Sequence, residues 1–86
     1  MYYAYILQSK KDQKLYFGHT NNVEKRLARH NDGQVKSTRS RRPFALICSR
    51  SFSSRSEAMK LERYLKILKG GEELKKILKL WGVAKR

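Results

Sequence analysis

The sequence predicts a single α+β domain in which helices flank a small three-stranded sheet. Three observations lead to this prediction. The chain has 86 residues, too few for a second independent core. Apolar side chains make up 40% of them, enough to build one small core. The hydrophobic pattern changes from short runs rich in β-favouring residues to longer runs with helical spacing, in the order β-β-α-β-α-α.

Two strands come first, over residues 2–7 and 15–20, because both runs combine aromatic and β-favouring residues. The polar stretch 10–14 between them has the length of a hairpin loop, which favours antiparallel pairing. Gly18 inside the second run indicates either a bulge or a close approach of another group to the backbone.

A helix is expected next, with Asn21 or Asn22 as its cap. Val23 and Leu27 are four residues apart and mark the buried stripe of this helix. Gly33 comes soon after this stripe and is the candidate C-terminal cap of the helix.

Residues 34–42 form a polar, basic loop that Pro43 closes, and residues 44–50 are predicted to form the third strand. Ser54 and Glu57 have the spacing of a capping box, which indicates the start of a second helix. The apolar stripe of that helix comprises Ala58, Leu61, Leu65 and Leu68.

A last amphipathic helix is predicted after the break at Gly70 and Gly71, ending at Gly82. Its apolar stripe comprises Leu74, Ile77, Leu78 and Trp81. The predicted domain therefore covers residues 1–82, and residues 83–86 form a short basic tail.

The charge of the chain predicts a polyanionic partner. Lys and Arg number 21 against seven Asp and Glu, a net charge of +14. Nucleic acid is the leading partner by this criterion, ahead of an anionic membrane surface or a role in packing ribosomal RNA. No run is long enough for a membrane-spanning helix, since the longest uncharged stretch covers residues 1–9. That stretch also lacks the basic start and cleavage site of a signal peptide.

Cys48 is the one cysteine, so no internal disulfide is possible and a reducing cytoplasm is the expected location. It lies in an apolar run, which favours a core position.

Several short segments together resemble the GIY-YIG nuclease family, and in particular its small stand-alone bacterial members. The two motif tripeptides correspond to YAY at residues 3–5 and YFG at residues 16–18, with ten residues between them. The later segments that match are NNVEKRLARHNDG, RSRRPFALI and SRSEAMKLERYLK. The resemblance covers about residues 1–80. His19 departs from the pattern, because some relatives have a lysine there.

The resemblance implies an active site with two tyrosines, an arginine and one metal ligand. Tyr5 and Tyr16 match the motif tyrosines, and the second is the favoured general base. Arg26 matches the arginine that contacts the scissile phosphate, for which a guanidinium offers a permanent charge and two parallel hydrogen bonds. Glu62 matches the ligand of a Mg²⁺ or Mn²⁺ ion.

The residues themselves leave alternatives open. Strand tyrosines are often amphipathic core residues, and Glu62 has a salt-bridge candidate in Lys66, four residues later on the same helix, and another in Arg26. His30 is four residues from Arg26 and matches a histidine of many members, with a proton relay or a phosphate contact as its role.

The basic loop is expected to contact phosphates through its charges and hydroxyls. Its candidate nucleic-acid-binding residues are Lys36, Thr38, Arg39, Arg41 and Arg42, of which Lys36 and Thr38 match family positions near the active site.

Together with the charge of the chain, the resemblance implies an endonuclease that requires a divalent metal ion and hydrolyses phosphodiester bonds, with DNA favoured as the substrate. A nucleic-acid-binding protein that retains the fold without activity is the alternative. For a nuclease, the side chains of Tyr5, Tyr16, Arg26 and Glu62 are expected on one face of the sheet.

Overall fold

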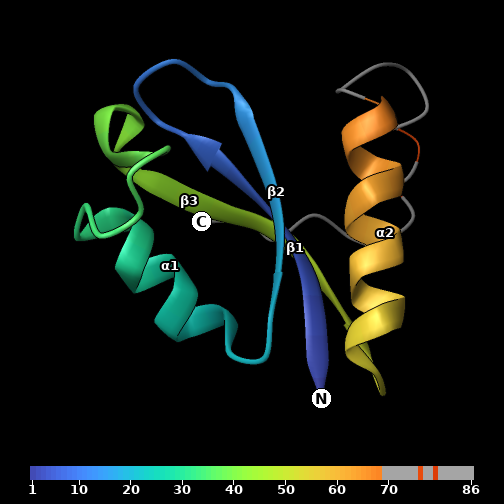
Figure 1. Ribbon diagram of the computed structural model, residues 1–86. Coiled ribbons are helices and arrows are strands. Elements are labelled where there is room, and N and C mark those ends of the chain that lie inside the picture. The colour runs from blue at the N-terminus through green and yellow to red at the C-terminus, as the bar shows by residue number, and fades with distance from the viewer. Residues whose placement is uncertain (69–75, 77–78, 80–86) are drawn as a thin grey trace.

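The computed structural model describes residues 1–68, Lys76 and Lys79 (Figure 1). The elements are β1 (Tyr2–Ser9), β2 (Leu15–Thr20), α1 (Val23–Asn31), a 3₁₀ turn (Arg39–Arg41), β3 (Phe44–Phe52) and α2 (Arg55–Leu68). The predicted α+β class and the order of its first five elements are confirmed. The predicted last helix and basic tail lie outside the described residues, apart from the exposed, helical Lys76 and Lys79.

The sheet has the order β2-β1-β3, and both neighbours pair antiparallel to the central strand β1. β1 and β3 are each longer than predicted, because backbone pairing continues through Gln8 and Ser9 in β1 and through Ser51 and Phe52 in β3. The register between β1 and β3 shifts between Ile6 and Leu7. The sheet's irregularity therefore lies in this pair of strands and not at Gly18.

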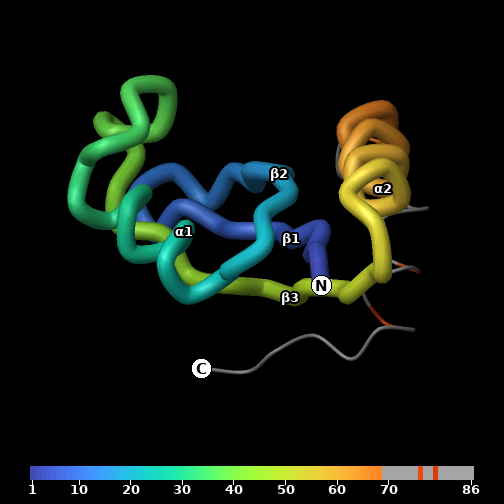
Figure 2. Tube along the Cα trace, turned by 60° about the horizontal axis from the view of Figure 1, so that its bottom comes forward, coloured from blue at the N-terminus to red at the C-terminus, as the bar shows by residue number. Residues whose placement is uncertain are grey.

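Helices cover both faces of this narrow sheet (Figures 1 and 2). Side chains alternate along a strand, so neighbouring residues of β1 point to opposite faces. On one face, Tyr5 and Leu7 pack in a cluster that Leu27 of α1 joins. On the other face, Ile6 packs with Leu65 of α2.

Cys48 lies in the cluster beneath α2, as its apolar run predicts. Burial raises the pKa of its thiol to about 11. Cys48 is therefore a protonated core residue at neutral pH. No helix among the described residues is long and apolar enough to cross a membrane.

Both helices begin as the sequence predicts. The Asn22 side chain caps α1 by accepting a hydrogen bond from the backbone N–H of Lys25 at 3.0 Å. Ser54 and Glu57 form the capping box of α2, in which the Glu57 backbone N–H donates to the Ser54 hydroxyl at 3.2 Å.

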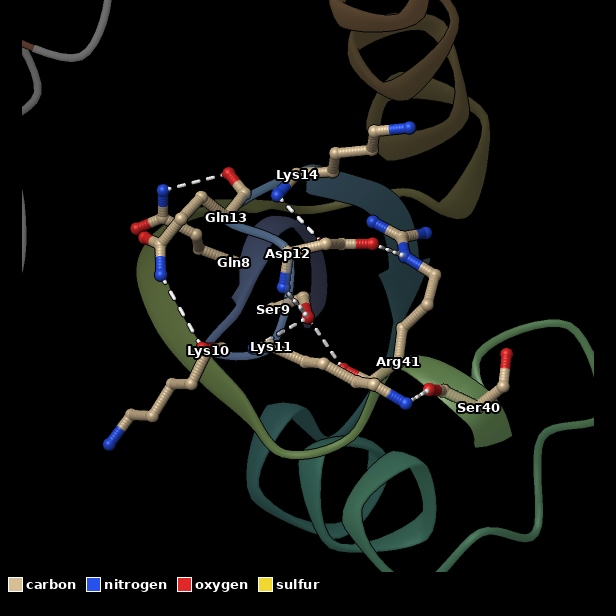
Figure 3. A network of polar contacts seen from close by, with 9 residues as sticks. All are labelled: Gln8, Ser9, Lys10, Lys11, Asp12, Gln13, Lys14, Ser40 and Arg41. Carbon is tan, nitrogen blue, oxygen red and sulfur yellow. Dashed lines mark hydrogen bonds and ion pairs between the residues drawn. The ribbon is translucent and has the colours of Figure 1, made fainter.

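The basic loop is docked against the β1–β2 hairpin (Figure 3). The buried Ser9 hydroxyl donates to the backbone carbonyl of Arg41 at 2.6 Å and accepts hydrogen bonds from the backbone N–H groups of Lys11 and Asp12. The Asp12 carboxylate in turn accepts from Nε of Arg41 at 3.1 Å. These contacts hold the loop at the hairpin end of the sheet.

Replacing Asn22 by alanine should destabilise the fold by about 1 kcal/mol, since the helix loses its side-chain cap. Urea unfolding followed by circular dichroism measures this change. Asn21→Ala is the matched control, because Asn21 is the neighbouring exposed asparagine and does not cap the helix. Equal effects of the two substitutions would contradict the assignment of the cap.

Candidate active site

Three aromatic rings from different elements meet on the face of the sheet that α1 covers. Tyr5 comes from β1, Tyr16 from β2 and His30 from the last turn of α1. The rings of Tyr16 and His30 meet edge to face with centroids 4.8 Å apart, and those of Tyr5 and Tyr16 are 6.4 Å apart. The structure therefore brings together three of the residues selected from the sequence.

His30 is completely buried at the centre of this cluster. Its Nε2 lies 3.3 Å from the Tyr5 hydroxyl, and its Nδ1 lies 2.8 Å from the Thr38 hydroxyl. Burial, followed by the charges of Arg26 and Arg29, lowers the pKa of His30 to about 4. The imidazole is therefore neutral at pH 7, and its two ring nitrogens lie between the hydroxyls of Tyr5 and Thr38.

The burial of His30 also corrects the expectation that it contacts phosphate, because no part of its side chain reaches the surface. Its two hydrogen bonds connect β1, α1 and the basic loop. They hold Tyr5 and Thr38 in place, and a proton relay through His30 stays a prediction.

The basic loop is less available to a ligand than its sequence suggests. Thr38 is completely buried beneath His30, so the expected contact of its hydroxyl with phosphate is wrong for this conformation. Arg41 is half-buried, with Nε bonded to Asp12 and its guanidinium carbon 5.5 Å from the centre of the Phe44 ring. Three of the five candidate residues are exposed: Lys36, Arg39 and Arg42.

Gly18 makes room for Tyr5. The two residues are opposite one another on paired strands. A Cβ atom at Gly18 would lie 2.5 Å from the Tyr5 hydroxyl, closer than real contacts allow. The close approach that the sequence indicates is thus explained by the ring of the first motif tyrosine.

Tyr5 is only 2% exposed. Burial raises its pKa, and the neighbouring Arg26 only partly offsets that effect. Tyr5 therefore keeps its proton at neutral pH, even in a chain with a net charge of +14. Tyr16 is half-buried and is the more accessible of the two tyrosines.

Arg26 lies beside both tyrosines. Hydrogen bonding to Tyr5 raises the pKa of the Arg26 guanidinium, burial opposes this, and Tyr16 adds to it. The Nε atom of Arg26 is buried and has no hydrogen-bond partner within the described part of the chain. A half-buried guanidinium with an unused donor is suited to binding an anion.

Glu62 approaches the sheet from α2. Its Oε1 lies 2.5 Å from Nδ1 of His19 on β2, and its Oε2 lies 2.7 Å from Nζ of Lys66. Burial acts to raise the pKa of Glu62, but the hydrogen bonds and charges of Lys66 and His19 outweigh it and lower the pKa below its usual value. The carboxylate is therefore ionised at neutral pH.

The expectation that Glu62 shares a sheet face with Arg26 is wrong. His19 is opposite Ala4 on the paired strands, so it points to the face that α2 covers, whereas Gly18 is opposite Tyr5. Glu62 and Arg26 reach the sheet from opposite sides of the edge strand β2. The charge of Glu62 still contributes to the raised pKa of Tyr5, so the two sides are electrostatically connected.

Glu62 can hold a divalent ion only as a single carboxylate ligand among the described residues. Within residues 1–68, Lys76 and Lys79, no three His, Cys, Asp or Glu side chains are grouped as metal ligands. Mg²⁺ is often held by one or two carboxylates and completes its coordination with water and substrate phosphate. Glu62 is suited to such a site, and binding there requires the Lys66 ammonium to move from Oε2.

His19 is a site residue that the sequence analysis noticed only as a departure from the family pattern. The strand alternation is the signal that predicts its face, because His19 follows Gly18 and therefore points away from Tyr5. Its partner was not predictable, because Glu62 is 43 positions later in the chain.

Comparisons with known proteins agree with the motifs. Residues 1–75 match the sequence pattern described as the GIY-YIG catalytic domain. The UPF0213 protein SH2523 of Staphylococcus haemolyticus is 46% identical over 77 residues, which are 88% of this chain and 93% of that protein. A UPF0213 protein of Bacillus licheniformis is 50% identical over 68 residues, 78% of this chain and 69% of its own.

A solved structure has a similar fold. The solution NMR structure of the UPF0213 protein BH0048 from Bacillus halodurans has a TM-score of 0.58 and 36% sequence identity to this chain. The alignment covers 95% of this chain and 88% of that one.

The neutral, buried His30 makes stability depend on pH. Between its unfolded pKa of 6.5 and its folded pKa of about 4, the unfolded chain binds the additional proton. Stability should therefore fall as the pH is lowered through this range, by up to about 3 kcal/mol from this group. Urea unfolding at intervals from pH 7 to pH 4.5 tests the prediction.

His30→Gln is the comparison for this experiment, because it cannot titrate in that range. The stability difference between wild type and variant should shrink as the pH falls. The lowered carboxyl pKa values of Asp12 and Glu62 act mainly below this window, because they decrease stability only as the carboxyl groups become protonated. Parallel profiles for the two proteins would contradict the assignment to His30.

Proposed function

Because this chain belongs to the GIY-YIG nuclease family, we propose that it is an endonuclease that hydrolyses phosphodiester bonds, with DNA as the favoured substrate. One observation carries the proposal. Arg26 places a half-buried guanidinium beside two tyrosines with its Nε unpaired in the described structure. This arrangement is suited to a phosphate that gains negative charge as it is attacked.

The accessibility of each side chain indicates its role in the reaction. The Arg26 guanidinium binds a non-bridging phosphate oxygen and stabilises its charge in the transition state. Tyr5 keeps its proton and holds Arg26 in place, with His30 behind it. Tyr16, the more accessible tyrosine, acts as the phenolate and takes the proton from the attacking water, which leaves a hydroxide to attack phosphorus and a neutral phenol.

Glu62 would hold the divalent ion, Mg²⁺ or Mn²⁺. When bound, such an ion neutralises charge on the phosphate and on the leaving oxygen. His19 orients the carboxylate from the β2 side through its contact with Oε1. On the α1 side, the exposed Lys36, Arg39 and Arg42 stay predicted phosphate contacts.

A second function has one observation in its favour. Both oxygens of Glu62 already contact cationic or hydrogen-bonding side chains within the chain, as in an ordinary structural ion pair. This arrangement is also expected for a nucleic-acid-binding protein without catalytic activity, the alternative to the nuclease.

Glu62→Gln separates these functions, because it removes the ligand charge and keeps the shape of the side chain. For the nuclease, Mg²⁺-dependent cleavage of labelled DNA and RNA should fall by about 100-fold or more. Binding measured in EDTA should persist, since an anionic group near the phosphates is lost. Glu57→Gln is the control on the same helix, because glutamine retains the capping box.

Melting temperatures complete the test. A large loss of stability in Glu62→Gln, together with an absence of metal-dependent cleavage by the wild type on every substrate, would favour the binding protein. Wild-type cleavage that Glu62→Gln leaves unchanged would contradict the assignment of the metal ligand.

A further inference from the structure

We propose that the nucleic-acid backbone lies in a basic groove that crosses the edge of the sheet at the end of β2 and continues along the exposed side of α2. The inference rests on the proposed function, because it assigns the substrate-binding surface of the same site. It adds a second surface to the sequence-based expectation, which placed phosphate contacts in the loop at residues 36–42.

The groove consists of four overlapping surface hollows. His19 lines three of them: one towards α1, one with Glu62 and Lys66, and one with Tyr2 and Arg55. The fourth lies on α2 and shares residues with two of these three. The edge of the sheet at His19 is therefore a crossing point, and a ligand there contacts both helices.

The α2 side of the groove is strongly basic. Arg55, Lys60 and Arg63 line the fourth hollow together with Ser56 and Met59, and no carboxylate lines it among the described residues. All three cationic side chains are exposed. From Arg55 to Lys66 the helix is about 17 Å long. That length of duplex axis carries about five phosphates on each strand.

The α1 side combines charge with neutral donors. Lys25, Arg26 and Arg29 line this hollow, next to Asn21 and other polar residues that follow β2. Amide and guanidinium groups are the usual partners of phosphate oxygens. Among the described residues that line the whole groove, Glu62 is the one carboxylate, and it lies at the crossing point.

This surface fits a polynucleotide better than a membrane. The positive side chains follow a path over two helices and a strand edge, as an extended polyanion does. The path also passes both Arg26 and Glu62, so a backbone bound along it would place a phosphate between the two halves of the candidate active site.

The basic loop lies at the other end of β2 from this groove. Lys11 and Asp12 of the hairpin contact Ser40 and Arg41 of the loop, which locates both segments at the start of β2 (Figure 3). β2 has six residues and is about 20 Å long, and His19 is near its far end. Binding at the groove and at the hairpin end can therefore be tested separately.

Two triple variants with the same loss of charge test the proposal. The groove variant is Arg55→Gln, Lys60→Gln, Arg63→Gln, and the hairpin variant is Lys10→Gln, Lys11→Gln, Lys14→Gln. Fluorescence anisotropy in EDTA, from 50 to 200 mM salt, measures the affinity of each for labelled duplex and single-stranded DNA. Circular dichroism and melting temperature show whether each variant is folded.

For duplex DNA, the logarithm of the binding constant falls linearly with the logarithm of the salt concentration. Each phosphate contact that is removed should make this slope shallower by about 0.9, so the slope of the groove variant should be shallower by about two to three in total. Its affinity at 50 mM salt should fall at least tenfold, whereas that of the hairpin variant should stay within about threefold of the wild type. If the groove triple variant does not fold, the single variants Lys60→Gln and Arg63→Gln should each make the slope shallower by about one.

Three results would overturn the proposal. Equal losses in both variants would mean that net charge alone controls binding. An unaffected groove variant, with a wild type that cleaves nucleic acid, would contradict the groove and leave the proposed function intact. A wild type that binds vesicles of anionic lipid but neither binds nor cleaves any DNA or RNA would contradict both.

Discussion

The central strand β1 must bury both of its faces, and the rest of the molecule is arranged around this requirement. Four consecutive residues, Ala4 to Leu7, are almost inaccessible to solvent. A helix packs on each face of β1, and a neighbouring strand pairs with its backbone along each edge. The site therefore opens to solvent beside β2, an edge strand, where Arg26 and Glu62 flank the sheet.

Buried polar groups connect segments that the small apolar core does not hold together. His30 joins Tyr5 to Thr38, and Ser9 joins the hairpin to Arg41. Leaving any of these groups without its partner would be costly, because a buried unsatisfied group loses water without compensation. Residues whose types suggest ligand binding thus serve to position the tyrosines and the loop.

The candidate site has two halves with different electrostatics. Towards α1, Arg26 and the tyrosines form a positive, partly dry cluster with an unused donor in the described structure. Towards α2, Glu62 is an ionised carboxylate between His19 and Lys66. A phosphate and a divalent ion complement these halves respectively, so a substrate that brings both would bridge the edge of β2. The basic groove follows the same line across the molecule.

The sequence by itself determined the features that depend on neighbouring residues. The three strands, the Asn22 cap, the Ser54–Glu57 capping box and the close approach at Gly18 each follow from short spacings along the chain. The motif spacing also identified the aromatic cluster, because Tyr5 and Tyr16 belong to paired strands of one hairpin.

Only the tertiary structure decided which of the selected side chains are available. Thr38 and Arg41 look like exposed loop residues, but their partners include His30, eight positions away, and Asp12, 29 positions away. Glu62 belongs to the opposite side of the sheet from Arg26 because α2 follows a third strand and packs beneath Ile6, and its partner His19 is 43 positions distant. Local patterns predict an element and its buried stripe. The face of the sheet that each helix covers depends on how the whole chain buries both faces of the central strand.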